Sequence, residues 1–158
     1  YIYNKNWHIT KDSYSLSLAL DDNPCYVLHS DIFFDNKIKK FIDDKYDNCA
    51  LLLNNHNRGK SSVNCSSHMG KINNIYKGEL LNNQDLEFTG VYKISDTELL
   101  QIWKKNCLQN PTKYISENLP IDLKKEIFAL NAESIMKYKI KTPLDYINFL
   151  NSQNNYGN

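Results

Sequence analysis

Glycine is scarce in this chain and is never clustered. The five glycines among 158 residues are Gly59, Gly70, Gly78, Gly90 and Gly157. A loop that presents its backbone N–H groups to phosphates needs several glycines close together, because side chains block the approach. The sequence therefore holds no glycine-rich phosphate-binding loop.

Excess charge and long apolar runs are also missing. Nineteen Lys and Arg residues face 18 Asp and Glu residues, so the net charge is +1. This balance argues against a broad basic face for nucleic acid or for an anionic membrane. No apolar stretch approaches the roughly 20 residues that span a bilayer. The first ten residues have no apolar core of signal-peptide type, so we expect a cytoplasmic protein.

Metal-binding cysteine and histidine motifs are absent as well. The four cysteines, Cys25, Cys49, Cys65 and Cys107, lie far apart and form no C-x-x-C. The four histidines form no H-E-x-x-H, which argues against a zinc site. We expect the cysteines to be free thiols that pack as small hydrophobic side chains.

Strand-like and helix-like segments alternate, which predicts an α/β layer architecture. The predicted strands are residues 1–3, 25–31, 49–55, 71–78, 87–95 and 134–140. The predicted helices are residues 12–20, 35–44, 95–106, 120–131 and 142–153, and residues 54–67 are predicted to be a polar, mobile loop. Strand, helix and strand between residues 25 and 55 predict a right-handed βαβ unit with parallel strands, whose first strand is buried on both faces. We expect one domain over 1–152 and a frayed tail over 153–158.

Asp31 is the most informative acidic residue. It ends the apolar run "CYVLHSD", where a buried strand would gain by staying apolar. Ligands collect outside the carboxyl ends of parallel strands, and Mg²⁺ is held there by one or two carboxylates together with water and phosphate oxygens. The alternative, that Asp31 merely ends the strand or caps a turn, stays open.

The order of segments extends this interpretation. "YNKNWHITKDSYSLSLAL", "YVLHSDIFFDNKIKKFID", "CALLL", "GKINNIYKGE" and "LEFTGVYKIS" follow one another, and "TPLD" begins the last helix. This succession resembles the central and C-terminal portion of the nucleoside-triphosphate transferase family, the sugar-phosphate and phosphocholine nucleotidyltransferases. The resemblance covers residues 4–149. It implies a three-layer, Rossmann-like mixed α/β sheet.

The resemblance also implies catalytic roles for Asp31 and Lys77. Asp31 resembles the family's metal-binding aspartate, which holds Mg²⁺ against the triphosphate and the incoming phosphate. Lys77, in "IYKG", resembles the lysine that faces the phosphorylated acceptor. A solvated lysine at a strand end is the alternative for Lys77.

Four further residues are implied in substrate binding. Gly90, in "EFTGVY", resembles the glycine whose missing side chain lets the acceptor lie against the backbone. Glu87 or Thr89 is expected to bond acceptor hydroxyls, and Ser15 falls near the nucleotide-side segment. Bulge formation or close strand packing is the alternative for Gly90, and helix N-terminal polarity is the alternative for Ser15.

Two departures from the family pattern stand out. The family's glycine-rich triphosphate loop is missing and the chain begins at Tyr1, so we expect a fragment without the N-terminal strands, with an unpaired sheet edge. The family's second metal ligand falls in "NAESIMKYKIKTPLDY", where Glu133 or Asn131 is the candidate. Two-carboxylate binding of Mg²⁺ is therefore in question.

The activity that the resemblance implies is transfer of a nucleoside monophosphate from a nucleoside triphosphate to a phosphorylated acceptor, either a sugar phosphate or phosphocholine, with release of pyrophosphate. A non-catalytic binding module of the same fold is one alternative. A metal-dependent glycosyltransferase is another, although "SDIFFD" offers Asp31 and Asp35 instead of an Asp-x-Asp. Neither the base, the acceptor nor the oligomeric state follows from the sequence.

Overall fold

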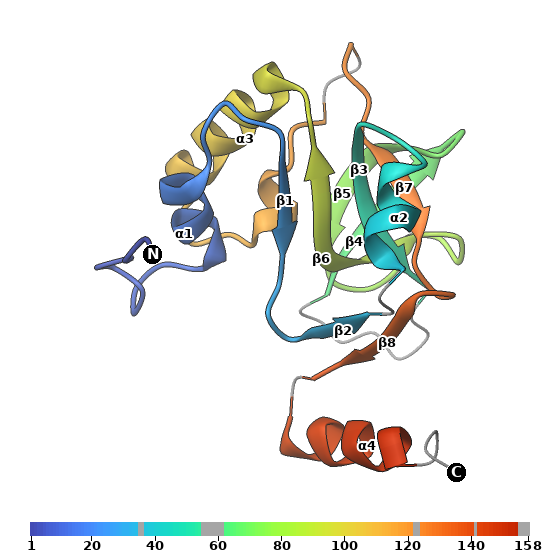
Figure 1. Cartoon of the computed structure of the whole chain (residues 1–158). Helices are drawn as coiled ribbons and strands as arrows, with labels where there is room; N and C mark the ends of the chain where they lie inside the picture. Colours follow the sequence, from blue (N-terminus) through green and yellow to red (C-terminus); the bar gives the residue numbers. More distant parts are fainter. Residues whose placement is uncertain (35–36, 55–61, 122–123, 141, 155–158) are drawn as a thin grey trace.

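A six-stranded mixed sheet organises the chain in the order β1-β6-β3-β7-β5-β4 (Figure 1). The computed structural model describes residues 1–34, 37–54, 62–121, 124–140 and 142–154. The strands of this sheet are β1 (Cys25–Leu28), β3 (Asn48–Leu53), β4 (Val63–His68), β5 (Lys71–Lys77), β6 (Leu86–Ile94) and β7 (Phe128–Asn131). A separate two-stranded sheet joins β2 (Ile32–Phe34) to β8 (Met136–Lys139).

Strand β6 lies between β1 and β3 and runs in the opposite direction to both. Both β1 and β3 pair antiparallel with β6, and β7 pairs parallel with β3. Strands β1, β3 and β7 therefore run in the same direction and end at the same edge of the sheet. The expected βαβ unit has its parallel strands, but β6 lies between them, because its nine residues are almost entirely buried and need a neighbour on each side.

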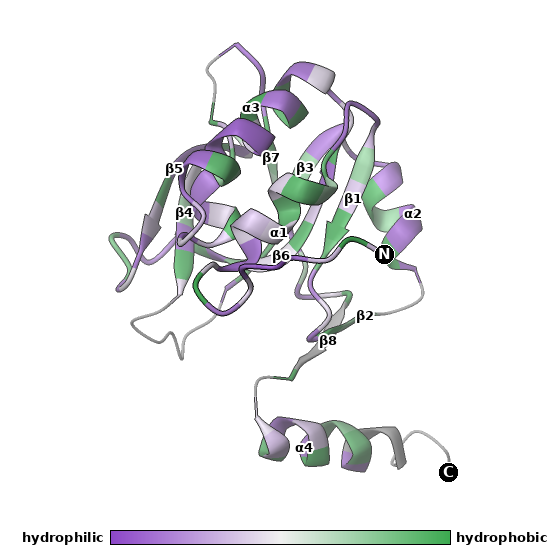
Figure 2. Ribbon diagram, turned by 90° about the vertical axis from the view of Figure 1, so that its left-hand side faces the viewer, coloured by the Kyte–Doolittle hydropathy of each residue, from purple (hydrophilic) through white to green (hydrophobic). Residues whose placement is uncertain are grey.

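Helices cover both faces of this sheet, which gives the predicted three layers. On one face, α1 (Asp12–Ala19), α3 (Thr97–Gln109) and the short 3-10 helix η1 (Ile115–Asn118) pack around buried Trp103 and Tyr92. On the other face, α2 (Ile38–Asp43) packs through Ile42 against a second apolar cluster that includes Leu51. Figure 2 shows the alternation of hydrophilic and hydrophobic residues along α3 that this packing requires.

Strand β1 lies at the edge of the sheet and is covered on one face only. Cys25 and Val27 pack toward the α1 and α3 side, whereas Tyr26 and Leu28 are 40% and 58% exposed. The expectation that this strand is buried on both faces is therefore wrong. An edge strand has one hydrogen-bonded neighbour, and α2 reaches only part of its outer face.

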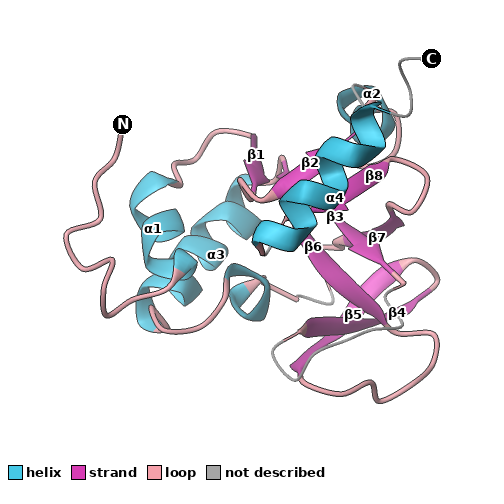
Figure 3. Ribbon diagram, turned by 90° about the horizontal axis from the view of Figure 1, so that it is seen from below, coloured by secondary structure: helices cyan, strands magenta, loops and turns pink. Residues whose placement is uncertain are grey.

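The last helix, α4 (Pro143–Asn154), lies beyond the β2–β8 sheet and away from the main sheet (Figures 1 and 3). The rings of Phe33 and Phe149 pack with centroids 4.2 Å apart and connect α4 to β2. Pro143 opens the helix, as predicted, because proline tolerates the first helical turn. Within the described residues, no helix is both long and apolar enough to cross a membrane.

Most predicted elements are confirmed, and three predictions are wrong. Residues 1–3 form no strand, and the described residues of the predicted helix, 120–121 and 124–131, form no helix but end in β7. The polar stretch 54–67 contains the first residues of β4 instead of being a loop throughout; its residues 55–61 lie outside the described part of the chain. Asp31 leads directly into β2, which the sequence did not predict.

Candidate functional site

A cavity of about 320 Å³ opens at the carboxyl end of β1. Its walls come from the start of α1, the turn after β1, the first half of β6 and η1. The lining residues are Asp12, His29, Asp31, Ser62, Val63, Glu87, Phe88, Gly90, Tyr114 and Ser116. A wider outer part adds Lys11 and Ser30 and shares Asp12, His29, Asp31 and Tyr114 with the inner part.

Asp31 lines both parts of this cavity; it was predicted to end a strand over 25–31, but β1 ends at Leu28 and Asp31 lies in the turn before β2. Its backbone carbonyl accepts a hydrogen bond from the Ile140 N–H at 2.8 Å, which fixes the turn between β1 and β2. Its side-chain Oδ1 is buried and has no hydrogen-bond partner within the described residues. A buried carboxylate oxygen without a donor suits a cation, because Mg²⁺ binds through one or two carboxylates and completes its shell with other oxygens.

His29 forms the floor of the cavity and accounts for the glycine at position 90. The His29 N–H donates to the Gly90 carbonyl at 3.0 Å, and the imidazole lies directly over Gly90. A Cβ at Gly90 would stand 2.6 Å from His29 Cγ, and the φ of Gly90 is +97°. The space above Gly90 is thus filled by His29, so a ligand there would contact the imidazole before the backbone.

Asp12 approaches the same imidazole from α1. Its Oδ2 lies 3.4 Å from His29 Nε2, while its Oδ1 accepts from the Ser13 N–H at 3.0 Å. The Asp12–His29 contact has the distance of an ion pair but not the geometry of a hydrogen bond, since Nε2 is buried without a hydrogen-bond partner in the described chain. The imidazole is therefore held between α1 and β6.

Glu87 and Thr89 are both buried but occupy different places. Glu87 lines the cavity, and its Oε1 accepts a hydrogen bond from Ser62 Oγ at 3.1 Å. Thr89 does not line the cavity, and its Oγ1 donates to the Leu51 carbonyl at 2.8 Å. Thr89 thus stabilises the junction of β6 with β3, where the register shifts.

Lys77 reaches the mouth of the cavity by way of Tyr114. Its Nζ stands 5.0 Å from the centroid of the Tyr114 ring, and Lys11 Nζ stands 3.9 Å from the same centroid. Tyr114 lines both the inner and the outer part. The rim therefore carries two ammonium groups on one aromatic ring, an arrangement stabilised by the ring quadrupole.

The other predicted residues lie elsewhere. Ser15 is exposed on α1 and accepts a hydrogen bond from Asn4 Nδ2 at 3.0 Å, outside the cavity lining. Asn131 Oδ1 accepts from the Glu133 N–H at 2.9 Å and shapes the turn after β7. Neither Asn131 nor Glu133 is among the residues that line the two parts of the cavity. Among the described residues, no three His, Cys, Asp or Glu side chains group into a metal site.

His29, Asp12 and Tyr114 are among the cavity residues that the sequence did not single out. His29 stands two residues before Asp31 in "HSD", which is the one signal that could have indicated it. Asp12 is the first residue of the helix predicted over residues 12–20. Tyr114 comes from a segment more than 80 residues further along the chain, and no local pattern indicates its place.

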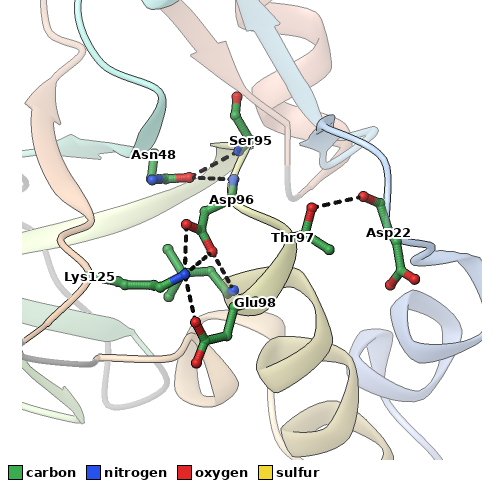
Figure 4. A network of polar contacts seen from close by, with 8 residues as sticks. Asp22, Asn48, Ser95, Asp96, Thr97, Glu98 and Lys125 are labelled. Carbon is green, nitrogen blue, oxygen red and sulfur yellow. Dashed lines mark hydrogen bonds and ion pairs between the residues drawn. The ribbon is translucent and has the colours of Figure 1, made fainter.

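A polar network at the other end of the strands, where β3 begins and β6 ends, holds the start of α3 in place (Figure 4). Asp96 caps the helix by accepting from the Leu99 N–H at 3.0 Å, and Lys125 Nζ lies 2.9 Å from both of its oxygens. Asn48 Oδ1 accepts from the N–H groups of Ser95 and Asp96. The Lys125 ammonium lowers the pKa of the Asp96 carboxyl, and Glu98 and Asp96 together raise the pKa of Lys125. Lys125 is paired with Asp96 and with Glu98, so this network serves the fold.

Comparison with solved structures shows the fold that these elements form. The CTP:phosphocholine cytidylyltransferase of Streptococcus pneumoniae superposes with a TM-score of 0.69 at 14% identity, over 94% of this chain and 66% of that one. A nucleoside-diphosphate-sugar pyrophosphorylase of Vibrio cholerae superposes with a TM-score of 0.61 at 16% identity, over 81% of this chain and 56% of that one. A Bacillus anthracis protein assigned as a glucose-1-phosphate thymidylyltransferase, solved with sucrose, superposes with a TM-score of 0.56 at 13% identity, over 94% of this chain and 61% of that one.

These identities establish a shared fold and nothing finer. No family model matches the sequence, and no curated protein matches it. The chain spans between 56% and 66% of the length of the three solved structures. The mixed α/β fold of the nucleotidyltransferases, predicted from the order of segments, is confirmed.

Proposed function

We propose that this chain is the acceptor-binding part of a nucleotidyltransferase, with the cavity at the end of β1 as the acceptor site. The observation that carries the proposal is Asp31, which lines this cavity and whose buried Oδ1 has no hydrogen-bond partner within the described residues. The fold likeness to enzymes named as nucleotidyltransferases supports the reaction class. Asp31 would hold Mg²⁺, which neutralises phosphate charge and aligns the two reactants.

The reaction needs little from the protein beyond alignment. An oxygen of the acceptor phosphate forms a bond to the α-phosphorus of the nucleoside triphosphate. The bond from that phosphorus to the bridging oxygen breaks, and its electron pair leaves with pyrophosphate. The attacking phosphate is already anionic, so no general base is required, and positioning together with electrostatic stabilisation supplies the catalysis. The cavity, which offers Asp31 and rim lysines, suits such a reaction.

The charge distribution favours an acceptor that carries both a phosphate and an ammonium group. The described residues lining the inner part include three carboxylates, Asp12, Asp31 and Glu87, and neither Lys nor Arg. One Mg²⁺ and one ammonium group would neutralise them. Lys11 and Lys77 stand on the Tyr114 ring at the rim, where a phosphate would lie. A phosphocholine-like acceptor fits this polarity better than a neutral sugar carrying a phosphate.

Calorimetric titration of the full chain tests the acceptor and the metal together. Phosphocholine in MgCl₂ is expected to bind more tightly than glucose 1-phosphate and to lose affinity in EDTA. Asp31→Asn should remove the magnesium dependence, whereas Asp44→Asn, the same change at an exposed residue outside the cavity, should not. Equal binding of both acceptors by every variant would refute the proposal.

Activity gives the second test. Pyrophosphate release by the full-length protein is expected to require Mg²⁺ and to fall at least about 100-fold in Asp31→Ala, the size of the loss when one charge-stabilising contact is removed. Unchanged turnover in that variant would remove Asp31 from the mechanism.

A further inference from the structure

Two buried polar atoms without hydrogen-bond partners lie in the same cavity. Within the described residues, three buried side-chain N or O atoms have no such partner: His29 Nε2, Asp31 Oδ1 and Asn64 Oδ1. The first two belong to residues that line both parts of the cavity. Buried polar atoms are almost always hydrogen-bonded, so two exceptions on residues that line one cavity indicate a ligand that bonds to both.

The His29 imidazole is held in place without using Nε2 in a hydrogen bond. Its backbone N–H donates to Gly90, its ring fills the space above Gly90, and Asp12 stands 3.4 Å from Nε2 on the α1 side. A ring fixed from two elements loses little conformational entropy when it binds a ligand. This is the property expected of a ligand-contacting side chain.

We propose that His29 contacts the phosphate of the acceptor, with Nε2–H donating to a phosphate oxygen beside the cation on Asp31. This inference rests on the proposed function and adds a residue to it. A phosphate oxygen accepts hydrogen bonds, so Nε2 takes part in this contact as the N–H donor. The phosphate would then lie in the outer part, near Lys11 and Ser30, and the ammonium group in the inner part, near Glu87.

Two substitutions separate the hydrogen bond from the shape of the ring. His29→Phe keeps an aromatic ring over Gly90 but removes Nε2, and His29→Gln supplies an amide N–H near the same place. Phosphocholine binding in MgCl₂ should weaken at least about ten-fold in His29→Phe and recover to within about three-fold in His29→Gln. His68→Gln, at an exposed residue of β4, is the matched control and should bind as the parent does. Thermal melting establishes that each variant is folded.

Imidazole NMR resonances provide a readout that does not depend on activity. Phosphocholine and inorganic phosphate, each with MgCl₂, should shift the His29 resonances, whereas choline chloride should leave them in place. If neither phosphate compound moves them, or if His29→Phe binds phosphocholine as tightly as the parent, the proposal is overturned. If inorganic phosphate moves them while phosphocholine binds no better than glucose 1-phosphate, the ammonium-bearing acceptor is refuted and the His29 contact stands.

Discussion

Replacing Gly90 by alanine tests the packing on which the site depends. The new Cβ would lie 2.6 Å from His29 Cγ and 2.7 Å from Nδ1, so the imidazole has to move. A side chain at a φ of +97° costs about 1 kcal/mol or more, and overpacking of this kind costs about 2 kcal/mol. The expected loss in the free energy of unfolding is about 3 kcal/mol, which corresponds to a fall in Tm of roughly 6–12 °C for a chain of this size.

Gly78→Ala is the matched control for this substitution. Gly78 has a φ of +110°, but nothing lies within 4 Å of the position of its Cβ. It therefore bears the backbone cost alone, about 1 kcal/mol, and the difference of about 2 kcal/mol measures the contact with His29. Urea unfolding followed by circular dichroism supplies both values.

A double-mutant cycle completes the test. In a His29→Ala background, Gly90→Ala should cost about as little as Gly78→Ala, because the ring that it displaces is gone. Equal losses for Gly90→Ala and Gly78→Ala in the parent chain would refute the packing of His29 over Gly90, and with it the geometry of the cavity floor.

Three further outcomes follow from other parts of the molecule. Asp96→Ala should lower stability by about 1–2 kcal/mol in urea unfolding, because it removes the α3 cap and the contact with Lys125. The pKa of Asp96 is lowered in the folded chain, so its contribution to stability is present at pH values above the ordinary Asp pKa and should vanish as the pH falls through the folded pKa. Asp96→Asn should abolish this pH dependence. Burial raises the pKa of Cys49 to about 11 and that of Cys107 to about 12, so iodoacetamide at pH 8 should label neither thiol in the folded chain but all four cysteines in urea, and stability should decline as the pH rises above 9.

The sequence predicted the central strands because their local patterns agree with their surroundings. Strand β6 and helix α3 have apolar residues where the core needs them, and Asp96 marks the helix start. The prediction failed at residues 120–131, where the apolar residues also fit a helix. In the structure Ile127 and Ala129 belong to one core cluster and Phe128 and Leu130 to the other, and pairing with β3 selects this alternation.

The site was predictable only where a single strand determines it. The place of Asp31 at the cavity could be predicted from the end of one strand. The place of His29 depends on contacts among β1, β6 and α1, and Tyr114 comes from a segment over 80 residues away. Thr89 was predicted as a substrate contact from its neighbour Gly90, but its hydroxyl donates to the main chain of β3. Contacts between distant segments are set by tertiary packing, which no local pattern records.

Because the His29 imidazole packs over Gly90, positions 29 and 90 have to change together. Any side chain added at one position has to be matched by lost volume at the other, because both share one space. Diversifying codon 90 alone should yield mostly damaged proteins, whereas randomising both codons should recover compensated combinations such as alanine at 90 with a smaller residue at 29. Redesign of the cavity therefore has to begin with this pair.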